Sequence, residues 1–283
     1  MQTFQLKQLP EFVQNIHSAP KLLYVVGDLE NLLQKPRVAV VGSRKVSPYG
    51  RSITTSLSGE LARQGVVIVS GLALGVDALA HQAALDAGGL TIAVLPCGLD
   101  KIYPAANRQL ATKIVAQGGA LVSEYPPETI AFKQYFIARN RLVSGLADGL
   151  LITEAAEKSG SLHTARFALE QGREVMAVPG SILSETSVGT NNLIKAGAAP
   201  ITSAEDVLQI LGLKSRLEAD KPLPKGSNDY EQRLIDLIVQ GTYDGNDLLV
   251  ASEFDTAIFN QTLTMLEITG KIRAVGANQW TLR

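Results

Sequence analysis

Two short apolar runs enclose a helical stretch in VAVVGSRKVSPYGRSITTSLSGELARQGVVIVSG, residues 38–71. The runs are rich in β-branched residues and nearly continuous, as expected for strands that are buried on both faces of a parallel sheet. The stretch between them is amphipathic and long enough to be the crossover helix that two parallel strands need. Residues 38–71 therefore predict a strand–helix–strand unit.

The same alternation continues along the chain. Four further apolar runs follow at TIAVLPCG (91–98), ALVSEY (120–125), GLLITEA (149–155) and EVMAVPG (174–180). Amphipathic stretches such as SLHTARFALEQGR (161–173) separate them. Repeated strand–helix alternation is typical of a doubly wound, mostly parallel α/β sheet of the Rossmann-like kind.

The flanking segments have different patterns. Residues 1–35 alternate helical and short apolar segments and are too few for a domain, so we expect an N-terminal arm that packs on the domain of residues 36–212. Residues 213–228 hold charges, prolines and a glycine without apolar periodicity, which predicts a linker. Residues 229–283 predict three short helices and a hairpin, the elements of a small winged-helix-like domain.

Composition narrows the class of protein. Hydrophobic residues make up 46% of the chain, and no apolar run approaches the roughly 18 residues of a membrane span. The first residues, MQTFQLKQLPEF, lack the basic start and the long apolar stretch of a secretory signal. Cys97 is the single cysteine, and no Cys/His cluster has metal-ligand spacing. We expect a cytoplasmic protein without membrane contact, bound metal or cofactor.

Charge is distributed unevenly along the chain. Residues 226–283 carry 4 basic and 8 acidic residues, a net charge of −4, which leaves 22 basic and 19 acidic residues, a net charge of +3, for residues 1–225. A polyanion is therefore expected to bind the larger domain, at a local patch. The third predicted helix of the small domain, residues 255–269, has no Lys or Arg, which favours a protein partner there over duplex DNA.

A glycine, a serine and an arginine follow the first predicted strand. In VVGSRKVSPYG (40–50), Gly42 lets the backbone approach a ligand, and Ser43 and Arg44 lie at the carboxyl edge of the sheet, where open α/β sheets bind ligands. The next helix begins near Tyr49, and its free N–H groups favour an anion. The motif is not GxGxxG, which weakens a dinucleotide interpretation. A tight turn with a surface arginine is the simpler alternative.

A second glycine-containing loop follows the next strand. Gly71 and Gly75 bracket this loop in VSGLALGVDALAH (69–81), and two such loops at adjacent strands predict a phosphate-binding nest. Asp77 and His81 lie four residues apart and share a helical face. They could form an acid–base pair or a hydrogen bond that pins the loop, and we favour the hydrogen bond because no nucleophile accompanies them.

The third motif, FKQYFIARNRLVSG (132–145), is basic and aromatic, and it contains no acidic residue. Its functional candidates are Lys133, Phe136, Arg139, Asn140 and Arg141, and two further rings, Phe132 and Tyr135, lie among them. Cations that hold a backbone, next to rings on which bases stack, are what a single strand of DNA requires. Phe132 and Tyr135 are expected in the core. For the two arginines, bracing the fold and touching DNA both remain open.

A further helix start lies at the same predicted edge of the sheet. Ser159, Gly160 and Ser161 precede the helix that begins in SGSLHTA (159–165), and its N-terminus favours an anion. Cys97, after the third strand, could be a nucleophile, but the sequence shows no activating partner, so we expect a small buried thiol. We assign no catalytic residue.

These motifs together resemble the DNA-processing protein A family, also called DprA or Smf. The matching stretches run in order over residues 36–212: VVGSR (40–44), SGLALGVDALAH (70–81), AVLPCGLD (93–100), Tyr103 with Pro104, Asn107, SEYPP (123–127), RNR (139–141), SGS (159–161), TAR (164–166), VPG (178–180) and LIKAGA (193–198). The resemblance implies an extended Rossmann domain that binds single-stranded DNA.

The resemblance also implies partners and residue roles. Members of the family load the recombinase RecA onto single-stranded DNA, protect incoming DNA during natural transformation, and typically act as homodimers. Arg44 falls on the arginine of the family's GSR motif, and Lys133 and Phe136 fall on its basic pocket and base-binding pocket. We therefore expect a non-catalytic recombination mediator.

The chain departs from the family pattern in three places. Glu128 stands where the family usually has glycine, His163 replaces a common isoleucine, and the N-terminal helical domain of many members is reduced to a short arm. The alternative function is a nucleotide-binding or nucleotide-hydrolysing Rossmann-like protein. Its phosphoribohydrolase form would need a Pro-Gly-Gly-x-Gly-Thr loop, to which VPGSI (178–182) and SVGTN (187–191) are the nearest stretches.

Overall fold

The computed structural model of the protein describes residues 1–16, 18–213, 224–276 and 278–282. The chain divides into two compact units, Met1–Ala219 and Asp220–Arg283. Residues 214–223, most of the linker predicted over 213–228, lie outside the described residues. Within the described residues, none of the helices combines the length and the hydrophobicity needed to cross a membrane.

The described residues of the first unit form a nine-stranded sheet in the order β1-β2-β6-β5-β4-β3-β7-β8-β9. The strands are β1 (Gln2–Gln5), β2 (Leu22–Val26), β3 (Arg37–Gly42), β4 (Val67–Ser70), β5 (Thr91–Val94), β6 (Ala120–Ser123), β7 (Gly149–Glu154), β8 (Glu174–Ala177) and β9 (Ala199–Pro200). From β6 to β9 every neighbouring pair is parallel. The predicted doubly wound, mostly parallel sheet is confirmed, and each of the six apolar runs is a strand.

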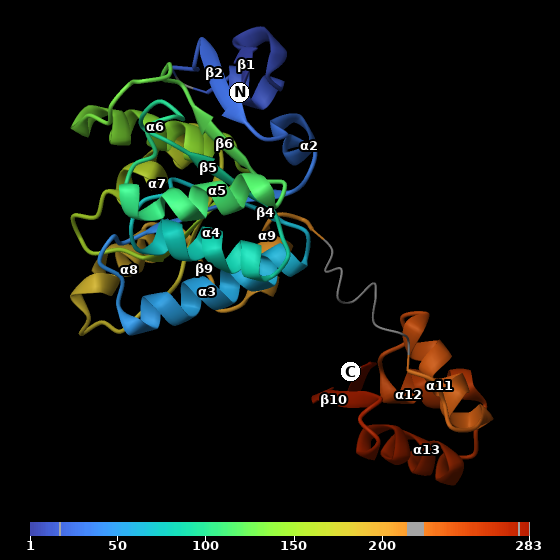
Figure 1. Cartoon of the computed structure of the whole chain (residues 1–283). Helices are drawn as coiled ribbons and strands as arrows, with labels where there is room; N and C mark the ends of the chain where they lie inside the picture. The colour runs from blue at the N-terminus through green and yellow to red at the C-terminus, as the bar shows by residue number, and fades with distance from the viewer. Residues whose placement is uncertain (17, 214–223, 277, 283) are drawn as a thin grey trace. The chain divides into compact units, whose positions relative to one another are not determined.

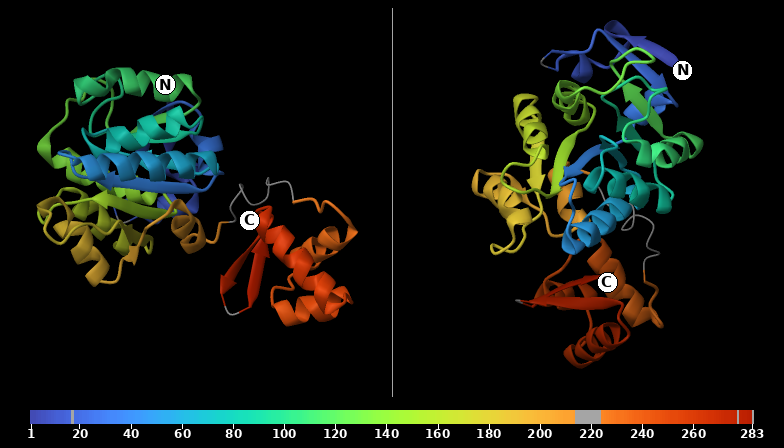
Figure 2. Two further views of the ribbon diagram at one scale, coloured as in Figure 1. Left: turned by 90° about the horizontal axis from the view of Figure 1, so that it is seen from below. Right: turned by 60° about the vertical axis from the view of Figure 1, so that its left-hand side comes forward.

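Helices cover both faces of this sheet (Figures 1 and 2). One face carries α3 (Pro48–Arg63), α4 (Val76–Asp86), α5 (Arg108–Ala116) and α9 (Ala204–Ile210), and the other carries α6 (Lys133–Gly145), α7 (Ser161–Glu170) and α8 (Val188–Lys195). Side chains alternate along each strand, so Val38 and Val40 pack with α3, while Ala39 and Val41 pack with α6. Burial on both faces explains why the strands read as continuous apolar runs.

The winding of the chain reverses at β3. The chain proceeds from β3 through β4 and β5 to β6 on one side, and then returns to place β7 on the other side of β3. Where the strand order of an open α/β sheet reverses, the loops that follow the two central strands diverge and leave a crevice at the carboxyl ends. The carboxyl ends of β3 and β7 are therefore the place where this fold positions a ligand.

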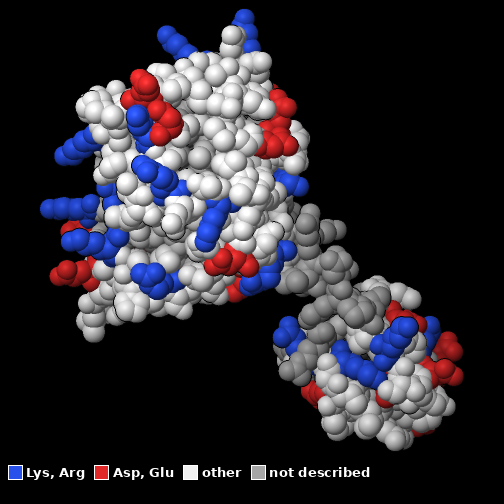
Figure 3. All heavy atoms as spheres, viewed as in Figure 1, with Lys and Arg blue, Asp and Glu red and all other residues white. Residues whose placement is uncertain are grey.

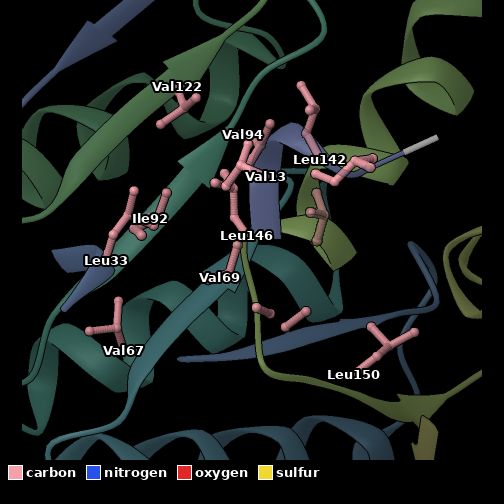
Figure 4. Close-up of a cluster of buried hydrophobic side chains, with 14 of the residues drawn as sticks. Val13, Leu33, Val67, Val69, Ile92, Val94, Val122, Leu142, Leu146 and Leu150 are labelled. Atoms are coloured by element: carbon pink, nitrogen blue, oxygen red, sulfur yellow. The ribbon is translucent and has the colours of Figure 1, made fainter. Parts of the chain in front are cut away.

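The residues predicted as an arm continue the sheet. β1 pairs with β2, and β2 pairs with β6, in both cases antiparallel. Between and after these strands lie η1 (Leu6–Gln8), α1 (Glu11–Gln14) and α2 (Leu29–Leu33). Val13 and Leu33 join the same hydrophobic cluster as Ile92 and Leu142 of the central domain (Figure 4). Residues 1–35 thus share one core with the rest of the first unit.

The second unit contains three helices followed by an antiparallel strand pair. These elements are α11 (Asp229–Val239), α12 (Gly245–Ser252), α13 (Thr256–Ile268), β10 (Ile272–Gly276) and β11 (Gln279–Leu282). Leu234, Ile238 and Leu266 lie in a hydrophobic core of their own. Three helices and a hairpin match the predicted element order, while the winged-helix-like classification stays a prediction.

Candidate nucleic-acid interface

A cleft of about 840 Å³ lies at the carboxyl ends of β3 and β7. Its walls come from the loop after β3, from α6, from the start of α7 and from residues 185–186 of η3 (Glu185–Ser187). Of the residues that the sequence predicted to bind nucleic acid, the cleft is lined by Gly42, Ser43, Arg44, Lys133, Phe136, Arg139, Asn140, Ser159, Gly160 and Ser161. The structure therefore brings together segments that are more than 100 residues apart.

Arg44, Phe136 and Tyr103 form a cationic and aromatic cluster in one wall of the cleft. The Arg44 guanidinium lies 5.2 Å from the centroid of the Phe136 ring, within the range of a cation–π interaction. Phe136 in turn meets Tyr103 edge to face, with ring centroids 5.3 Å apart. Tyr103 is 48% exposed and lines the cleft, so its ring is accessible to a ligand. Rings next to a cation are a surface on which a nucleic-acid base can stack.

Tyr103 was not predicted as a site residue. It lies in the loop between β5 and η2 (Ala105–Asn107), where no periodic pattern indicates which way a side chain points. The signal that the sequence did offer was the position of Tyr103 within the family motif.

Helical periodicity explains which side chains of α6 enter the cleft. Lys133, Phe136 and Asn140 are spaced i, i+3, i+7 and share one face, and all three line the cleft. Lys45 and Lys158, which the sequence did not single out, add two exposed cations to the lining. On the face shown in Figure 3, several basic side chains project from the left-hand edge of the first unit, with acidic side chains beside them.

Arg139 lies beneath the cleft and braces the sheet. Its side chain is buried, with 3% exposure, and its Nη1 donates hydrogen bonds to the carbonyl oxygens of Gly71 and Val94. These carbonyls follow and end the adjacent strands β4 and β5, so one guanidinium links the two carboxyl ends. Burial lowers the pKa of Arg139 to about 10, which leaves the group charged at neutral pH. Of the two roles left open, the contacts of Arg139 are those of a brace.

Arg141 also makes structural contacts, and it lies outside the cleft lining. Its guanidinium donates to both carboxylate oxygens of Glu124, at 3.2 and 2.6 Å. The ion pair is largely buried, with side-chain exposures of 10% and 17%. A bidentate pair of this kind fixes α6 against the segment that follows β6. The guanidinium is therefore engaged within the protein.

Gly71 and Gly75 also lie outside the cleft lining, although we predicted that they form a phosphate-binding nest. The Gly71 carbonyl accepts from Arg139, and its N–H donates to the Asp77 carboxylate at 3.1 Å. Gly75 has a φ of +81°, and a Cβ there would collide with the carbonyl oxygens of Ser43 and Arg44. Both glycines shape the protein's own backbone, and their polar groups are used within the fold.

Asp77 pins the loop that follows β4. Its carboxylate accepts hydrogen bonds from the N–H groups of Gly71 and Ala73, at 3.1 and 3.4 Å. Burial raises the pKa of Asp77, while the positive charge of Arg139 opposes that shift. These bonds correspond to the loop-pinning alternative and use the carboxylate that an acid–base pair would need.

His81 is buried and uncharged. Its Nδ1 lies 2.6 Å from the Thr91 hydroxyl, which itself donates to the Ile68 carbonyl, so Nδ1 carries the proton in this contact. Nε2 of His81 is buried without a hydrogen-bond partner. Burial lowers the pKa of His81 to about 3, and Arg139 contributes in the same direction. His81 therefore lies in the protein interior, where α4 packs on β5.

The low pKa of His81 predicts acid-sensitive stability. In the unfolded chain His81 binds a proton near pH 6.5, but in the folded chain it does so only near pH 3. The contribution of neutral His81 to the free energy of unfolding is therefore fully present above pH 6.5 and is lost as the pH falls toward 3. We expect His81 to lower the free energy of unfolding by about 2 kcal/mol between pH 7 and pH 5. Urea titrations of wild type and His81→Leu at both pH values measure this difference.

In the His81→Leu variant, the loss between pH 7 and pH 5 is expected to shrink by that amount. Asp77 is present in both proteins, so its own titration cancels in the comparison. An equal pH dependence for the two proteins would contradict the buried neutral state of His81.

The N-terminus of α3 differs from what the sequence predicted. We expected free N–H groups near Tyr49, but Ser47 caps the helix by accepting from the Gly50 N–H at 3.0 Å. The Ser47 N–H donates to a carboxylate oxygen of Glu154 at 2.9 Å. The prediction of an open anion site at α3 is therefore wrong, because a side chain from β7 fills it. Local sequence could not reveal this partner, which lies 107 residues away.

Cys97 has the environment of a structural thiol. It is fully buried, and its Sγ–H donates to the Lys101 carbonyl at 2.9 Å. Burial raises the pKa of Cys97, which keeps the thiol protonated and poorly nucleophilic at neutral pH. Among the residues that the structure describes, no group of three or more His, Cys, Asp or Glu side chains is arranged to hold a metal ion.

Glu128 has a backbone conformation that favours glycine. Its φ is +66°, in the left-handed region that glycine adopts at little cost. Its N–H donates to the Asp100 carboxylate at 2.8 Å. This chain therefore holds a glutamate in a backbone conformation that glycine adopts more easily.

The fold and the cleft define a Rossmann-like α/β protein with a cationic and aromatic site at the point where its strand order reverses. Residues 1–212 match the sequence profile of the family DNA recombination-mediator protein A. The chain belongs to this family, and the resemblance inferred from its motifs is confirmed. The match ends before the second unit begins.

Relatives of known name agree with this assignment. The chain is 44% identical over 205 residues to DNA processing protein DprA of Bacillus subtilis, covering 72% of this chain and 69% of the relative. It is 48% identical over 192 residues to protein Smf of Escherichia coli, covering 68% of this chain and 51% of the relative. The chain thus spans only about half the length of the Smf protein.

Two solved structures share the fold. The X-ray structure of DprA from Streptococcus pneumoniae matches with a TM-score of 0.70 and 44% identity, covering 74% of this chain and 73% of the other. DNA processing protein A from Helicobacter pylori, studied for its single-stranded DNA binding mode, matches with a TM-score of 0.67 and 39% identity, covering 74% of this chain and 95% of the other.

Proposed function

We propose that the protein binds single-stranded DNA in the cleft at the carboxyl ends of β3 and β7, and that it loads RecA onto the strand without catalysing a reaction. The observation that carries the proposal is the cluster of Arg44, Phe136 and Tyr103 in the cleft, a cation–π contact next to an edge-to-face pair of rings. The cations supply phosphate contacts, and the rings supply stacking that tolerates any base, worth about 1–3 kcal/mol per base. We further propose that the protein acts in the cytoplasm as a homodimer.

The relatives support the DNA ligand. The Helicobacter pylori protein, whose single-stranded DNA binding was studied, covers 74% of this chain at 39% identity. The cleft contains residues from the segments that carry the family motifs, including Arg44 and Lys133. A cleft of about 840 Å³ would also admit a mononucleotide, so a nucleotide ligand is the competing outcome of the binding test.

The internal use of the reactive groups supports a role without catalysis. Asp77 is engaged by backbone N–H groups, His81 is buried and uncharged, and the Cys97 thiol is held protonated. An acid–base or nucleophilic mechanism would need a group that is free to react with the ligand. Of these three groups Asp77 lines the cleft, and its carboxylate is engaged by the N–H groups of the loop after β4. The exposed cations and rings are instead suited to holding a strand.

Removing one cation and one ring from α6 should abolish DNA binding. Lys133→Glu with Phe136→Ala eliminates a phosphate contact and the stacking platform, and we expect affinity for oligo-dT to fall by more than about 100-fold. Fluorescence anisotropy of labelled oligo-dT, at two salt concentrations, measures the loss. Wild-type binding should weaken with salt because phosphate contacts release counterions.

The matched control is Lys113→Glu, an exposed lysine in the last turn of α5. It carries the same charge reversal as Lys133→Glu but lies outside the cleft lining, and it should bind like wild type. Equal affinity of the double variant and the control would contradict the assignment of the site. If wild type bound thymidine nucleotides but not oligo-dT, the nucleotide alternative would replace the proposal.

RecA loading is tested on a strand that is already covered by single-strand-binding protein. On such a strand the DNA-dependent ATPase activity of RecA is expected to start after a lag. The wild-type protein should shorten this lag, whereas the Lys133→Glu, Phe136→Ala variant should leave it unchanged. A DNA-binding wild type that does not shorten the lag would limit the function to strand binding.

A further inference from the structure

The side chain of Glu154 reaches from the end of β7 to the start of α3. It is 1% exposed, and its carboxylate accepts hydrogen bonds from the N–H of Ser47, at 2.9 Å, and from the Ser47 hydroxyl. The Glu154 carbonyl accepts from the Ser43 N–H at 2.8 Å. One buried residue therefore holds both the loop that follows β3 and the N-terminus of the helix that follows it.

In doubly wound sheets, the start of the helix that follows the central strand is a common position for a ligand. The helix after the central strand presents its N-terminal N–H groups and the positive end of its dipole at the crevice, and nucleotide-binding members of this fold class hold a phosphate there. α3 is 16 residues long and starts at that position. Here the negative group at the helix start belongs to the protein itself.

The first turn of α3 leaves room for this carboxylate. Gly50 lies in the first turn of the helix and is buried, and a Cβ at this position would come within 2.6 Å of a Glu154 carboxylate oxygen. A side chain at this position would displace the Glu154 carboxylate, so the glycine lets the carboxylate approach the helix. The start of α3 is built around an anion, and Glu154 supplies it.

We propose that Glu154 takes the place of a nucleotide phosphate at α3 and so excludes free nucleotides from this part of the crevice. A ligand anion would meet both a filled position and a negative charge. Ligand binding is left to the neighbouring cleft, whose lining includes Arg44 and Lys133 but neither Glu154 nor the first residues of α3. A polymer reaches these cations through several phosphates. Glu154 is a residue that determines specificity, and this role holds whether or not the cleft binds DNA.

The test replaces Glu154 by alanine and supplies inorganic phosphate as the probe. In Glu154→Ala, the emptied helix start is expected to bind phosphate, so the melting temperature should rise with phosphate concentration and saturate, relative to sodium chloride at equal ionic strength. Calorimetry should give at least about tenfold tighter phosphate binding than in wild type.

Thr153→Val is the matched control for lost packing. Thr153 is also buried and contacts α3 through the Thr54 hydroxyl at 2.6 Å, but its removal opens no anion position. Glu154→Gln keeps the volume filled and removes the charge, so it should respond to phosphate as little as wild type does. A phosphate response of Glu154→Ala no larger than that of Thr153→Val overturns the proposal.

If Glu154→Ala is too unstable in chloride for these measurements, its refolding is measured in phosphate and in chloride. Recovery of folded protein in phosphate but not in chloride supports the proposal, because the added anion replaces the missing carboxylate. Failure to refold in either buffer, while Glu154→Gln folds, overturns it. Both readouts use phosphate without DNA, so a failed proposal here is distinguishable from a failure of oligo-dT binding.

Discussion

Replacing Arg44 by glutamate is expected to weaken binding of oligo-dT by at least about 100-fold, or about 2.7 kcal/mol, while leaving the protein folded. Arg44 is an exposed residue of the loop after β3, so the reversal of its charge is tolerated by the fold. The substitution removes a cation from the cleft, introduces repulsion of the DNA phosphates and breaks the contact with the Phe136 ring.

Salt dependence separates this effect from misfolding. Each phosphate contact that is lost in single-strand binding should lower the slope of log K against log salt by about 0.7. Anisotropy over a salt series gives the slope, and circular dichroism with thermal melting checks the fold. The Lys113→Glu variant carries the same change of charge outside the cleft and serves as the reference. A folded Arg44→Glu protein with wild-type affinity and slope would remove Arg44 from the DNA site.

Replacing Arg139 by leucine is expected to destabilise the first unit by about 3–5 kcal/mol. The guanidinium is buried, donates to the carbonyls of Gly71 and Val94, and supplies the positive charge opposite Asp77. Leucine would leave two carbonyls and a buried carboxylate without their cation, and a buried unpaired charge is among the most costly defects in a protein interior. Urea denaturation at pH 7 measures the change.

A double-mutant cycle with Asp77→Asn tests the electrostatic reason. With Asp77 neutral, Arg139→Leu no longer leaves an unpaired charge, so the double variant should be more stable than the sum of the two single effects implies. Additive effects would show that Arg139 acts through its hydrogen bonds to the strand ends alone. A loss below about 1 kcal/mol for Arg139→Leu would contradict its role as a brace.

The two arginines of the RNR motif mark the limit of sequence-based prediction at the site. Both lie on α6 within two residues of each other, and the sequence predicted them as DNA contacts or as braces. In the structure, Arg139 bonds to carbonyls at two strand ends, whereas Arg141 pairs with Glu124. Residues at i and i+2 point in different directions from a helix, and their partners are chosen by packing with distant segments.

The first glycine-containing loop shows the same limit. The sequence placed Gly42, Ser43 and Arg44 correctly at the carboxyl edge, because strand ends and loop residues are readable from local pattern. It placed an open helix N-terminus next to them, which the structure shows to be filled by Glu154. The contact joins residues from different parts of the chain, and nothing in the composition of either segment specifies it.

The sequence by itself determined the parallel sheet, its reversal into a doubly wound arrangement and the edge at which ligand-facing loops gather. Apolar runs of strand length and amphipathic crossovers act locally, and the rules for connecting parallel strands leave few arrangements. Only the tertiary structure decided that β1 and β2 extend the sheet, that Tyr103 joins Phe136 and Arg44 in the cleft, and that Glu154 closes α3. The physical reason is that pairing across a sheet edge and contacts between loops depend on register and packing over long sequence separations, which local periodicity does not encode.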